Sequence, residues 1–420
     1  MLERLLAVGP SGVRVRPLGG DRAGEVRIGR FLRNRRVTSG EMFTTAAAGT
    51  LERVAGRHIL VPQDTTSLRD DGDKRSLQLH PAIALDAGDG ALLGLVHAEF
   101  LRRDGTVRRH CNKRLLAEKD SQRWVTALTK AGALIASGAA GVTVISDREG
   151  DIYEEFVCRP SGVDVLIRAR LDRVLVDGGH LYASTEGLAE LGRETIALPA
   201  APGRPARQAC IALRACPVEI KRPQRPSVEA AAQLPPSVTL YLVEAYEVAP
   251  PPDATRIHWR LLTTHAVTSF AEATRITGFY RQRWTIEQLF RVMKTKGFDI
   301  EAVRIEDTTP FENLAAATLI AAIKVQQMVR DRDGQAGRPA SDVVEPAALP
   351  AIEVISKSLE GNTAKQKNPH PSGSLAHTAW VCARLGGWNG YYGKPGPVVI
   401  LQGHIRLKTM IRGWSLSQDV

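Results

Sequence analysis

The chain has 420 residues, of which 43% are hydrophobic and 24% are charged, which are the proportions of an ordinary globular protein and exclude a disordered or fibrous one. The 56 lysines and arginines outnumber the 45 aspartates and glutamates, so the formal net charge of +11 predicts an anionic partner, with nucleic acid as the first candidate. Five scattered cysteines without a Cys-x-x-Cys pair argue against a disulfide framework or a zinc site. We find no signal peptide and no apolar run long enough to span a membrane, and therefore expect a soluble cytoplasmic protein.

The first acidic residue of interest is Asp64. Residues 1–54 are expected to be poorly ordered apart from a remnant helical segment, because residues 1–24 have no usable periodicity. The stretch that starts at His58 is typical of a short buried strand, and it ends in a turn that presents Asp64. Two more strands are predicted, Leu79–Leu85 and Ala91–Phe100, with a turn of Asp and Gly residues between them. Considered alone, Asp64 is an ordinary turn residue.

The second acidic residue, Asp147, follows the β-branched segment Gly141–Ser146. A buried strand that enters an acidic turn containing glycine and then a helix is a common position for a ligand site in α/β sheets. Considered alone, Asp147 is more simply a cap of the following helix. Residues 161–265 then alternate strand-like runs with proline clusters, which predicts a β-rich segment with proline-marked loops.

The third candidate, Glu287, lies in the segment Tyr280–Lys294, after a capping box (Ser269-Phe-Ala-Glu272) that opens a helical region. Glu287 and Lys294 are two helical turns apart and share a face, and an unbroken helix would add Tyr280 and Arg283 to that face. A second capping box, Thr285 with Gln288, would instead restart the helix after Arg283. The simplest alternative for the charges is an exposed ion pair between Arg283 and Glu287. Four apolar residues on another side predict docking on a core, namely Ile286, Leu289, Phe290 and Met293.

The spacing Tyr-x2-Arg-x3-Glu-x6-Lys in this segment resembles the signature of bacterial DDE transposases of the insertion-sequence-four family. The residues around Asp64 (Gln-Asp-Thr-Thr-Ser-Leu) and around Asp147 (Asp-Arg-Glu-Gly-Asp-Ile) resemble the first and second acidic motifs of that family, in the same order. The resemblance covers roughly residues 26–420. It implies an α/β fold with a ribonuclease-H-like core, in which a mixed sheet is flanked by helices, with a β-rich insertion and a helical C-terminal region.

The residue patterns and the resemblance together predict five segments. They are a poorly ordered N-terminus with its helical remnant (1–54), the first part of the core (55–160), the β-rich insertion (161–265), the completion of the core with the signature helix (266–330), and a C-terminal helical region that would mediate dimerisation (331–420).

By resemblance, Asp64, Asp147 and Glu287 are the catalytic residues and the ligands of two Mg²⁺ or Mn²⁺ ions. Such hard cations prefer carboxylate oxygens, and two of them can activate a nucleophile and stabilise a leaving oxygen in phosphodiester chemistry. Glu149 and Asp151 are candidates for residues that contact and orient these metal ligands without binding the metal themselves.

The resemblance assigns DNA contacts to five further residues. Tyr280, Arg283 and Lys294 match residues that hold DNA phosphates beside the metals. Trp259 matches an aromatic residue that accepts a base flipped out of the transposon end, although a tryptophan on a strand can equally belong to the core. Arg168 matches an insertion residue near that base.

The implied function is cut-and-paste transposition, in which water cleaves at the transposon end, the freed 3′-hydroxyl forms a hairpin, and the reopened end joins target DNA. The implied partners are double-stranded DNA, both as terminal inverted repeats and as target, and a second copy of the chain in a synaptic complex, with a nucleoid-associated location. Two alternatives remain open: a structure-selective nuclease of the same fold, and a truncated, non-catalytic inhibitor of a full-length transposase. The second arises because only 63 residues precede Asp64, where the family usually carries a further helical domain that grips the transposon end.

Overall fold

The computed structural model describes residues 18–69, 76–103, 120–198, 200, 205–224, 234–252 and 254–418. The chain forms two compact units, each built from several segments. The first unit comprises Met1–Arg57, Thr65–Asp104 and Thr285–Val420, and the second comprises His58–Asp64 and Gly105–Trp284. In the part of the chain that is described, no helix is long and apolar enough to cross a membrane.

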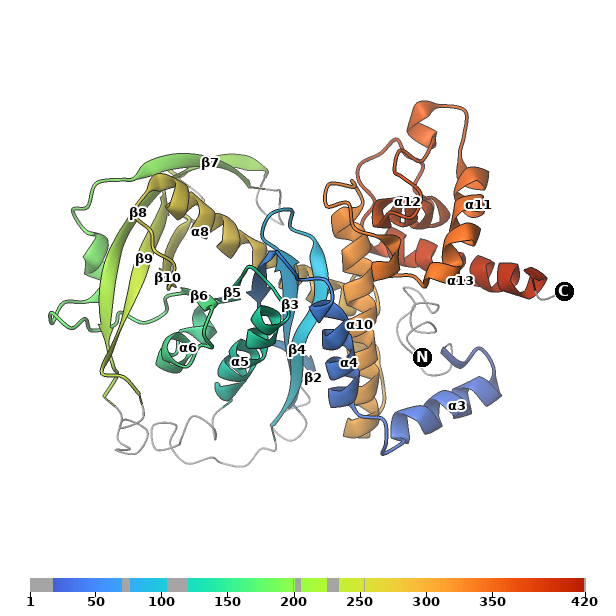
Figure 1. Ribbon diagram of the computed structural model, residues 1–420, viewed down its shortest axis with the longest axis horizontal. Coiled ribbons are helices and arrows are strands. Elements are labelled where there is room, and N and C mark those ends of the chain that lie inside the picture. The colour runs from blue at the N-terminus through green and yellow to red at the C-terminus, as the bar shows by residue number, and fades with distance from the viewer. Residues whose placement is uncertain are drawn as a thin grey trace. The chain divides into compact units, whose positions relative to one another are not determined.

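A mixed sheet forms the centre of the second unit (Figure 1). Strand β1 (His58–Pro62) pairs in parallel with β5 (Gly141–Ser146), which pairs in parallel with β6 (Val163–Arg168). From β6 the sheet continues with antiparallel neighbours, in the order β10 (His258–Thr263), β9 (Ser237–Glu247), β8 (Arg207–Lys221) and β7 (Gly192–Leu198). All residues of β5 after Gly141 are buried, as expected for a parallel strand that is covered on both faces.

Among its described residues, the second unit also contains three helices and two short 3₁₀ turns. Helix α5 (Gln122–Ala136) packs against β5, β6 and α6 (Tyr153–Val157), while α8 (Phe270–Gln282) packs against β1, β8 and β9. The predicted capping box at the start of α8 is confirmed, since Ser269 and Glu272 each accept a hydrogen bond from the backbone N–H of the other. The 3₁₀ turns are η4 (Arg148–Gly150) and η5 (Leu181–Thr185).

The first unit combines three antiparallel strands with helices. Strand β3 (Ser76–Asp86) pairs with both β2 (Thr66–Arg69) and β4 (Leu92–Arg103), which confirms the predicted hairpin between β3 and β4. The helices in the described part of this unit are α3 (Arg22–Arg33), α4 (Ser39–Leu51), α9 (Trp284–Met293), α10 (Thr308–Asp331), α11 (Leu349–Leu359), α12 (Leu375–Leu385) and α13 (Pro397–Gln418). The 3₁₀ turns are η6 (Ile300–Ala302), η7 (Ala340–Asp342), η8 (Pro346–Ala348) and η9 (Ala364–Gln366).

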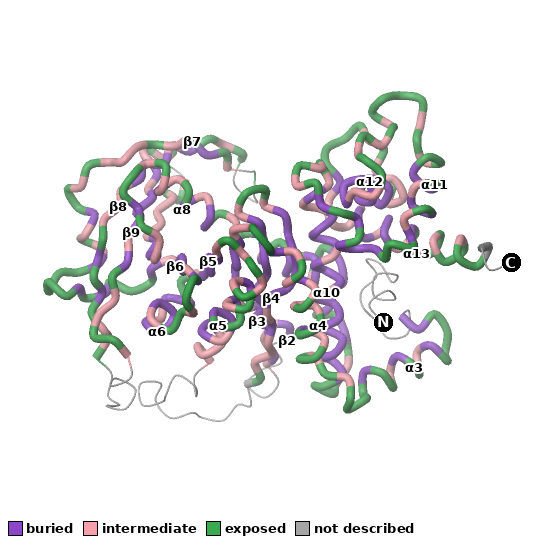
Figure 2. Tube along the Cα trace, viewed as in Figure 1, coloured by how far each residue is buried: buried purple, intermediate pink, exposed green. Residues whose placement is uncertain are grey.

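Helix α10 is the most central helix of the first unit. It packs against β4, α3, α4, α12 and α13, and most of its length is buried (Figure 2). Its apolar residues lie on all sides, as is typical of an interior helix. Its buried Glu312 accepts hydrogen bonds from Arg102 of β4 at 2.6 Å (Nε) and 2.7 Å (Nη2), so this charge is paired in the two-bond geometry that stabilises a buried carboxylate.

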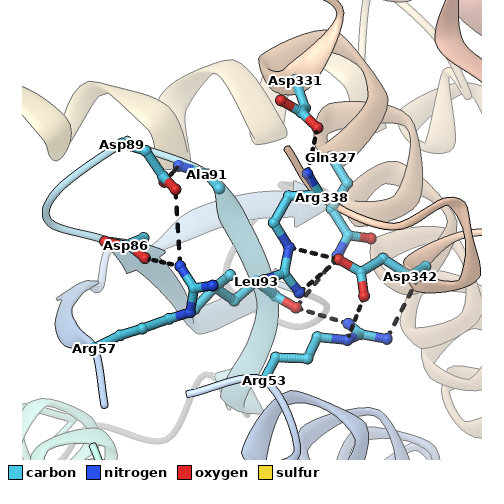
Figure 3. Close-up of polar contacts among 10 residues, drawn as sticks. All are labelled: Arg53, Arg57, Asp86, Asp89, Ala91, Leu93, Gln327, Asp331, Arg338 and Asp342. Atoms are coloured by element: carbon cyan, nitrogen blue, oxygen red, sulfur yellow. Dashed lines mark hydrogen bonds and ion pairs between the residues drawn. The ribbon is translucent and has the colours of Figure 1, made fainter. Parts of the chain in front are cut away.

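A polar network joins the start of β4 to the segment after α10 (Figure 3). Arg53 donates a hydrogen bond to the Leu93 carbonyl at 2.7 Å and pairs with Asp342 at 3.1 Å, and Arg338 pairs with the same carboxylate at 2.7 Å. Asp331 accepts a hydrogen bond from the Arg338 N–H at 3.1 Å. Because Arg338 and Asp342 are buried, the paired charges hold this loop in one arrangement.

Two expectations for the N- and C-terminal regions need correction. The expected poor order of the first 24 residues is wrong from Leu18 onward, because Asp21 caps α3 by accepting the Gly24 N–H at 2.6 Å, and α3 buries Ile28 and Leu32, four residues apart. Residues 1–17 lie outside the described part of the chain. The prolines of residues 332–374 predict a loose stretch after α10, but this stretch contains the regular helix α11.

His404 of α13 makes the stability of the first unit sensitive to acid. Its side chain is fully buried beside Cys382 of α12, with 3.7 Å between Nδ1 and Sγ, and burial lowers the pKa of His404 to about 3. In the unfolded chain His404 becomes protonated below about pH 6.5, but in the folded chain only near pH 3. The contribution of His404 to the free energy of unfolding is therefore fully present above pH 6.5 and is lost as pH falls. We expect urea unfolding to show a loss of about 2 kcal/mol between pH 6.5 and pH 5 from this residue.

The substitution His404→Leu should remove that part of the pH dependence, and replacing the exposed His180 by Gln should leave it unchanged. An equal pH dependence in wild type and His404→Leu would contradict this assignment.

Candidate active site

Asp64 and Asp147 follow the carboxyl ends of two neighbouring parallel strands in the second unit. Pro62 of β1 is in register with Ile145 of β5, and the Gln63 N–H donates to the Ile145 carbonyl at 3.0 Å, so the pairing continues past the end of β1. Asp64 and Asp147 each lie two residues beyond the Pro62–Ile145 pair. Since paired strands are about 4.8 Å apart, the two acidic residues emerge side by side at the edge where α/β sheets commonly bind ligands.

Asp147 also caps the turn that follows it. Its Oδ1 accepts the Glu149 N–H at 2.7 Å at the start of η4, so the capping interpretation from the sequence is confirmed. A carboxylate has two oxygens with several lone pairs, and a single backbone bond does not use up this capacity. The half-exposed Asp147 can therefore cap η4 and bind a cation at the same time.

Asp64 is paired with Arg283, the residue that directly follows α8. Arg283 Nη1 donates to Asp64 Oδ2 at 2.9 Å, and only 13% of the Arg283 side chain and 17% of the Asp64 side chain are exposed. The two residues are more than 200 positions apart, so the fold itself brings this cation to the acidic edge. A guanidinium beside a carboxylate offsets its charge and has further N–H donors with which to bind a phosphate.

Tyr280 and Trp259 place two aromatic rings close to this pair. Tyr280 is buried and Trp259 is half-buried, and the ring centroids lie 5.5 Å apart in an edge-to-face arrangement. Burial raises the pKa of Tyr280, and the charges of Arg283, Arg168 and Asp147 also act on it. Tyr280 therefore remains a neutral phenol near neutral pH and can donate its hydroxyl proton to an acceptor such as a phosphate oxygen.

Arg168 ends β6 beside the strand that carries Trp259. It is in register with Leu261 of β10, and its Nη2 donates to the His258 carbonyl at 3.2 Å. The second unit therefore brings together six of the residues selected from the sequence, namely Asp64, Asp147, Tyr280, Arg283, Trp259 and Arg168.

The signature segment is divided between the two units. The unbroken helix considered from the sequence is wrong, because α8 ends at Gln282 and α9 begins at Trp284. The restart begins one residue before Thr285, whose hydroxyl accepts a hydrogen bond from Arg330 at 2.9 Å. The predicted apolar stripe of α9 is confirmed, since its four residues Ile286, Leu289, Phe290 and Met293 are all buried.

Glu287 and Lys294 belong to the first unit. Glu287 lies half-exposed on α9, and Lys294, directly after α9, pairs through Nζ with Glu301 at 2.8 Å. Within the described residues, no group of three or more His, Cys, Asp or Glu side chains is arranged to hold a metal ion. The carboxylates of Asp64 and Asp147 still fit a hard divalent cation by their donor type and common edge, and the three-carboxylate site stays a prediction.

The side chains of the two candidates for supporting the metal ligands have other partners. Asp151 is buried and accepts hydrogen bonds from Arg173 Nη2 at 2.6 Å and from the N–H groups of Arg170 and Leu171, so its carboxylate fixes the loop after β6. The exposed Glu149 pairs with Arg123 at 2.9 Å.

Sequence reasoning missed one carboxyl group near the acidic edge. Glu155 of α6 is completely buried and accepts hydrogen bonds from Gln63 and Ser146, the residues that directly precede Asp64 and Asp147. Its only signal in the sequence is its position in an otherwise apolar helix, Tyr-Glu-Glu-Phe-Val.

The family model described as transposase DDE domain matches residues 88–323, more than half of the chain. The matched span contains Asp147 and Glu287, and Asp64 lies before it. The chain belongs to the transposase DDE domain family.

Proposed function

We propose that this chain is a cut-and-paste transposase of the insertion-sequence-four family, which hydrolyses a phosphodiester at transposon ends and joins the freed 3′-end to target DNA. The observation that carries the proposal is the placement of Asp64 and Asp147 at the ends of paired parallel strands, in a chain of the DDE transposase family. Family membership implies DNA as the partner, and the net charge of +11 agrees with a polyanion.

In this proposal Asp64, Asp147 and Glu287 hold two Mg²⁺ or Mn²⁺ ions. When bound, these ions supply charge neutralisation and activation of the attacking hydroxyl. Asp147 is fixed by its bond to the Glu149 N–H, and Asp64 is fixed by Arg283, so both carboxylates are oriented before a cation arrives.

The remaining residues act on the DNA. Arg283 and Tyr280 supply donors beside the acidic edge that can bind phosphate oxygens next to the scissile bond. Lys294, which directly follows α9, is the third phosphate-binding residue that the family resemblance assigns. The half-buried Trp259 offers an aromatic face on which an unstacked base can lie, and Arg168 on the adjacent strand can bind the phosphate of that nucleotide. Two copies of the chain would hold the two ends of the element.

The test is incubation of the purified protein with Mg²⁺, a labelled duplex carrying the terminal inverted repeat of the element, and a target plasmid. We expect cleavage at the repeat boundary followed by joined product, and no product in EDTA. Cleavage without any joined product would favour the structure-selective nuclease, and DNA binding without cleavage would favour the non-catalytic inhibitor.

A further inference from the structure

Three buried side chains that hydrogen-bond to one another lie next to the two acidic residues of the second unit. Glu155 Oε1 accepts hydrogen bonds from Gln63 Nε2 at 2.7 Å and from Ser146 Oγ at 2.5 Å, and Gln63 Nε2 also donates to Ser146 Oγ at 3.0 Å. All three residues have no exposed surface. The carboxyl group of α6 therefore joins the end of β1 to the end of β5 through side chains as well as through the sheet.

Each of the two bonded residues is covalently joined to an acidic residue. Gln63 precedes Asp64, and Ser146 precedes Asp147. Because side chains of successive strand residues point to opposite faces, fixing Gln63 and Ser146 on one face also fixes the direction in which Asp64 and Asp147 leave the sheet. A shift of Glu155 would change the separation of the two acidic side chains.

The turn after Asp147 packs against the same carboxyl group. A Cβ atom added at Gly150 would lie 2.5 Å from Ser146 Cβ and 2.8 Å from Glu155 Oε2, so only glycine fits without displacing its neighbours. The Gly150 N–H donates to the Asp147 carbonyl at 3.2 Å. Glu155 therefore contacts the end of β1, the end of β5 and the turn that Asp147 begins.

A carboxyl group is energetically unfavourable at this buried position. Burial raises the pKa of Glu155 to about 8, and Oε2 has no hydrogen-bond partner among the described residues. An apolar side chain of the same size would avoid these costs, so packing alone does not account for a carboxyl group here. An apolar side chain cannot, however, accept the two hydrogen bonds from Gln63 and Ser146.

We propose that Glu155 is a positioning residue, which holds Asp64 and Asp147 at the separation needed for one divalent cation by accepting hydrogen bonds from Gln63 and Ser146. This inference rests on the proposed function, because it concerns the same pair of carboxylates. Residues that orient the metal ligands without binding the metal typically contribute about 10- to 100-fold to metal affinity.

The test is the affinity of the full-length protein for Mn²⁺ alone, measured by electron paramagnetic resonance on wild type, Glu155→Leu and Glu155→Gln. Glu155→Leu keeps the volume but removes the acceptor, and should weaken Mn²⁺ binding by at least about 10-fold. Glu155→Gln keeps an oxygen that accepts both bonds, and should bind Mn²⁺ within about threefold of wild type. Glu247→Leu, which removes an equally buried glutamate of β9, is the control for general destabilisation and should leave Mn²⁺ affinity unchanged.

The outcomes separate this inference from the proposed function when Asp147→Asn is included. Weaker Mn²⁺ binding in Asp147→Asn with wild-type affinity in Glu155→Leu would overturn the positioning role alone, and so would a Glu155→Gln variant as defective as Glu155→Leu. Unchanged Mn²⁺ binding in Asp147→Asn would overturn the metal site and the inference together.

If Glu155→Leu does not fold, the variant Ser146→Ala tests the inference instead. It removes one of the two hydrogen bonds to Glu155 with little change in volume, and should weaken Mn²⁺ binding several-fold. Wild-type Mn²⁺ affinity in Ser146→Ala would overturn the inference.

Discussion

Asp147→Asn should abolish Mg²⁺-dependent DNA cleavage, with a fall of at least about 10³-fold in the single-turnover rate, while DNA affinity changes little. Loss of a metal ligand removes several kcal/mol of transition-state stabilisation, which corresponds to a rate loss of that size. Asparagine retains a side-chain oxygen that can accept the Glu149 N–H, so the cap of η4 and the fold are kept. DNA affinity depends mainly on phosphate contacts made elsewhere.

The matched control for this substitution is Asp177→Asn. Asp177 also accepts the N–H of the residue two positions later, Gly179, at 2.8 Å, but it lies in an exposed loop. Asp177→Asn should cleave DNA at the wild-type rate. Equal losses of cleavage and of binding in gel-shift assays of Asp147→Asn would contradict this prediction, because they would indicate damage to the fold and not the selective loss of a metal ligand.

Asp151→Ala should produce the largest loss of stability of any substitution considered, about 3–5 kcal/mol in the free energy of unfolding. Both oxygens of Asp151 are used, Oδ1 by Arg173 and Oδ2 by the N–H groups of Arg170 at 2.7 Å and Leu171 at 2.9 Å. The side chains of Asp151 and Arg173 are 0% and 5% exposed, so the substitution leaves a buried guanidinium without its carboxylate. The loop after β6 would lose its anchor at the same time.

Urea unfolding followed by circular dichroism measures this loss. The control is Asp172→Ala, which removes an exposed carboxylate that pairs with His180 in the same loop and should cost about 1 kcal/mol or less. A loss below about 1 kcal/mol for Asp151→Ala would contradict the account, because it would mean that the Arg173 charge finds water or another partner at little cost.

Local patterns were sufficient for several elements. The capping box of Ser269 and Glu272, the buried strand before Asp147 and the apolar stripe of α9 depend on residues within one or two turns of each other, and all three are found in the structure. The same patterns could not decide where the signature segment breaks. Arg283 keeps helical dihedral angles (φ −53°, ψ −33°), so the interruption between α8 and α9 leaves no mark in local propensity.

Contacts between distant residues account for most of what the sequence did not reveal. Glu155 contacts Gln63, 92 positions away, and no pattern distinguishes it from its neighbour Glu154. Asp151 was selected for its position near Asp147, but the long-range partner Arg173 determines what it does. Motif spacing identified residue types, while the partners of each side chain depend on the packing of strands and helices.

The most direct test of the central claim is the crystal structure of the full chain with Mn²⁺, in which anomalous scattering locates the ions. The account predicts Mn²⁺ bound by carboxylate oxygens of Asp64, Asp147 and Glu287, with the three carboxyl carbons within roughly 8 Å of one another, the span of a two-metal centre. Mn²⁺ bound elsewhere, or an ordered Glu287 whose carboxyl carbon lies twice that distance from the other two, would contradict it.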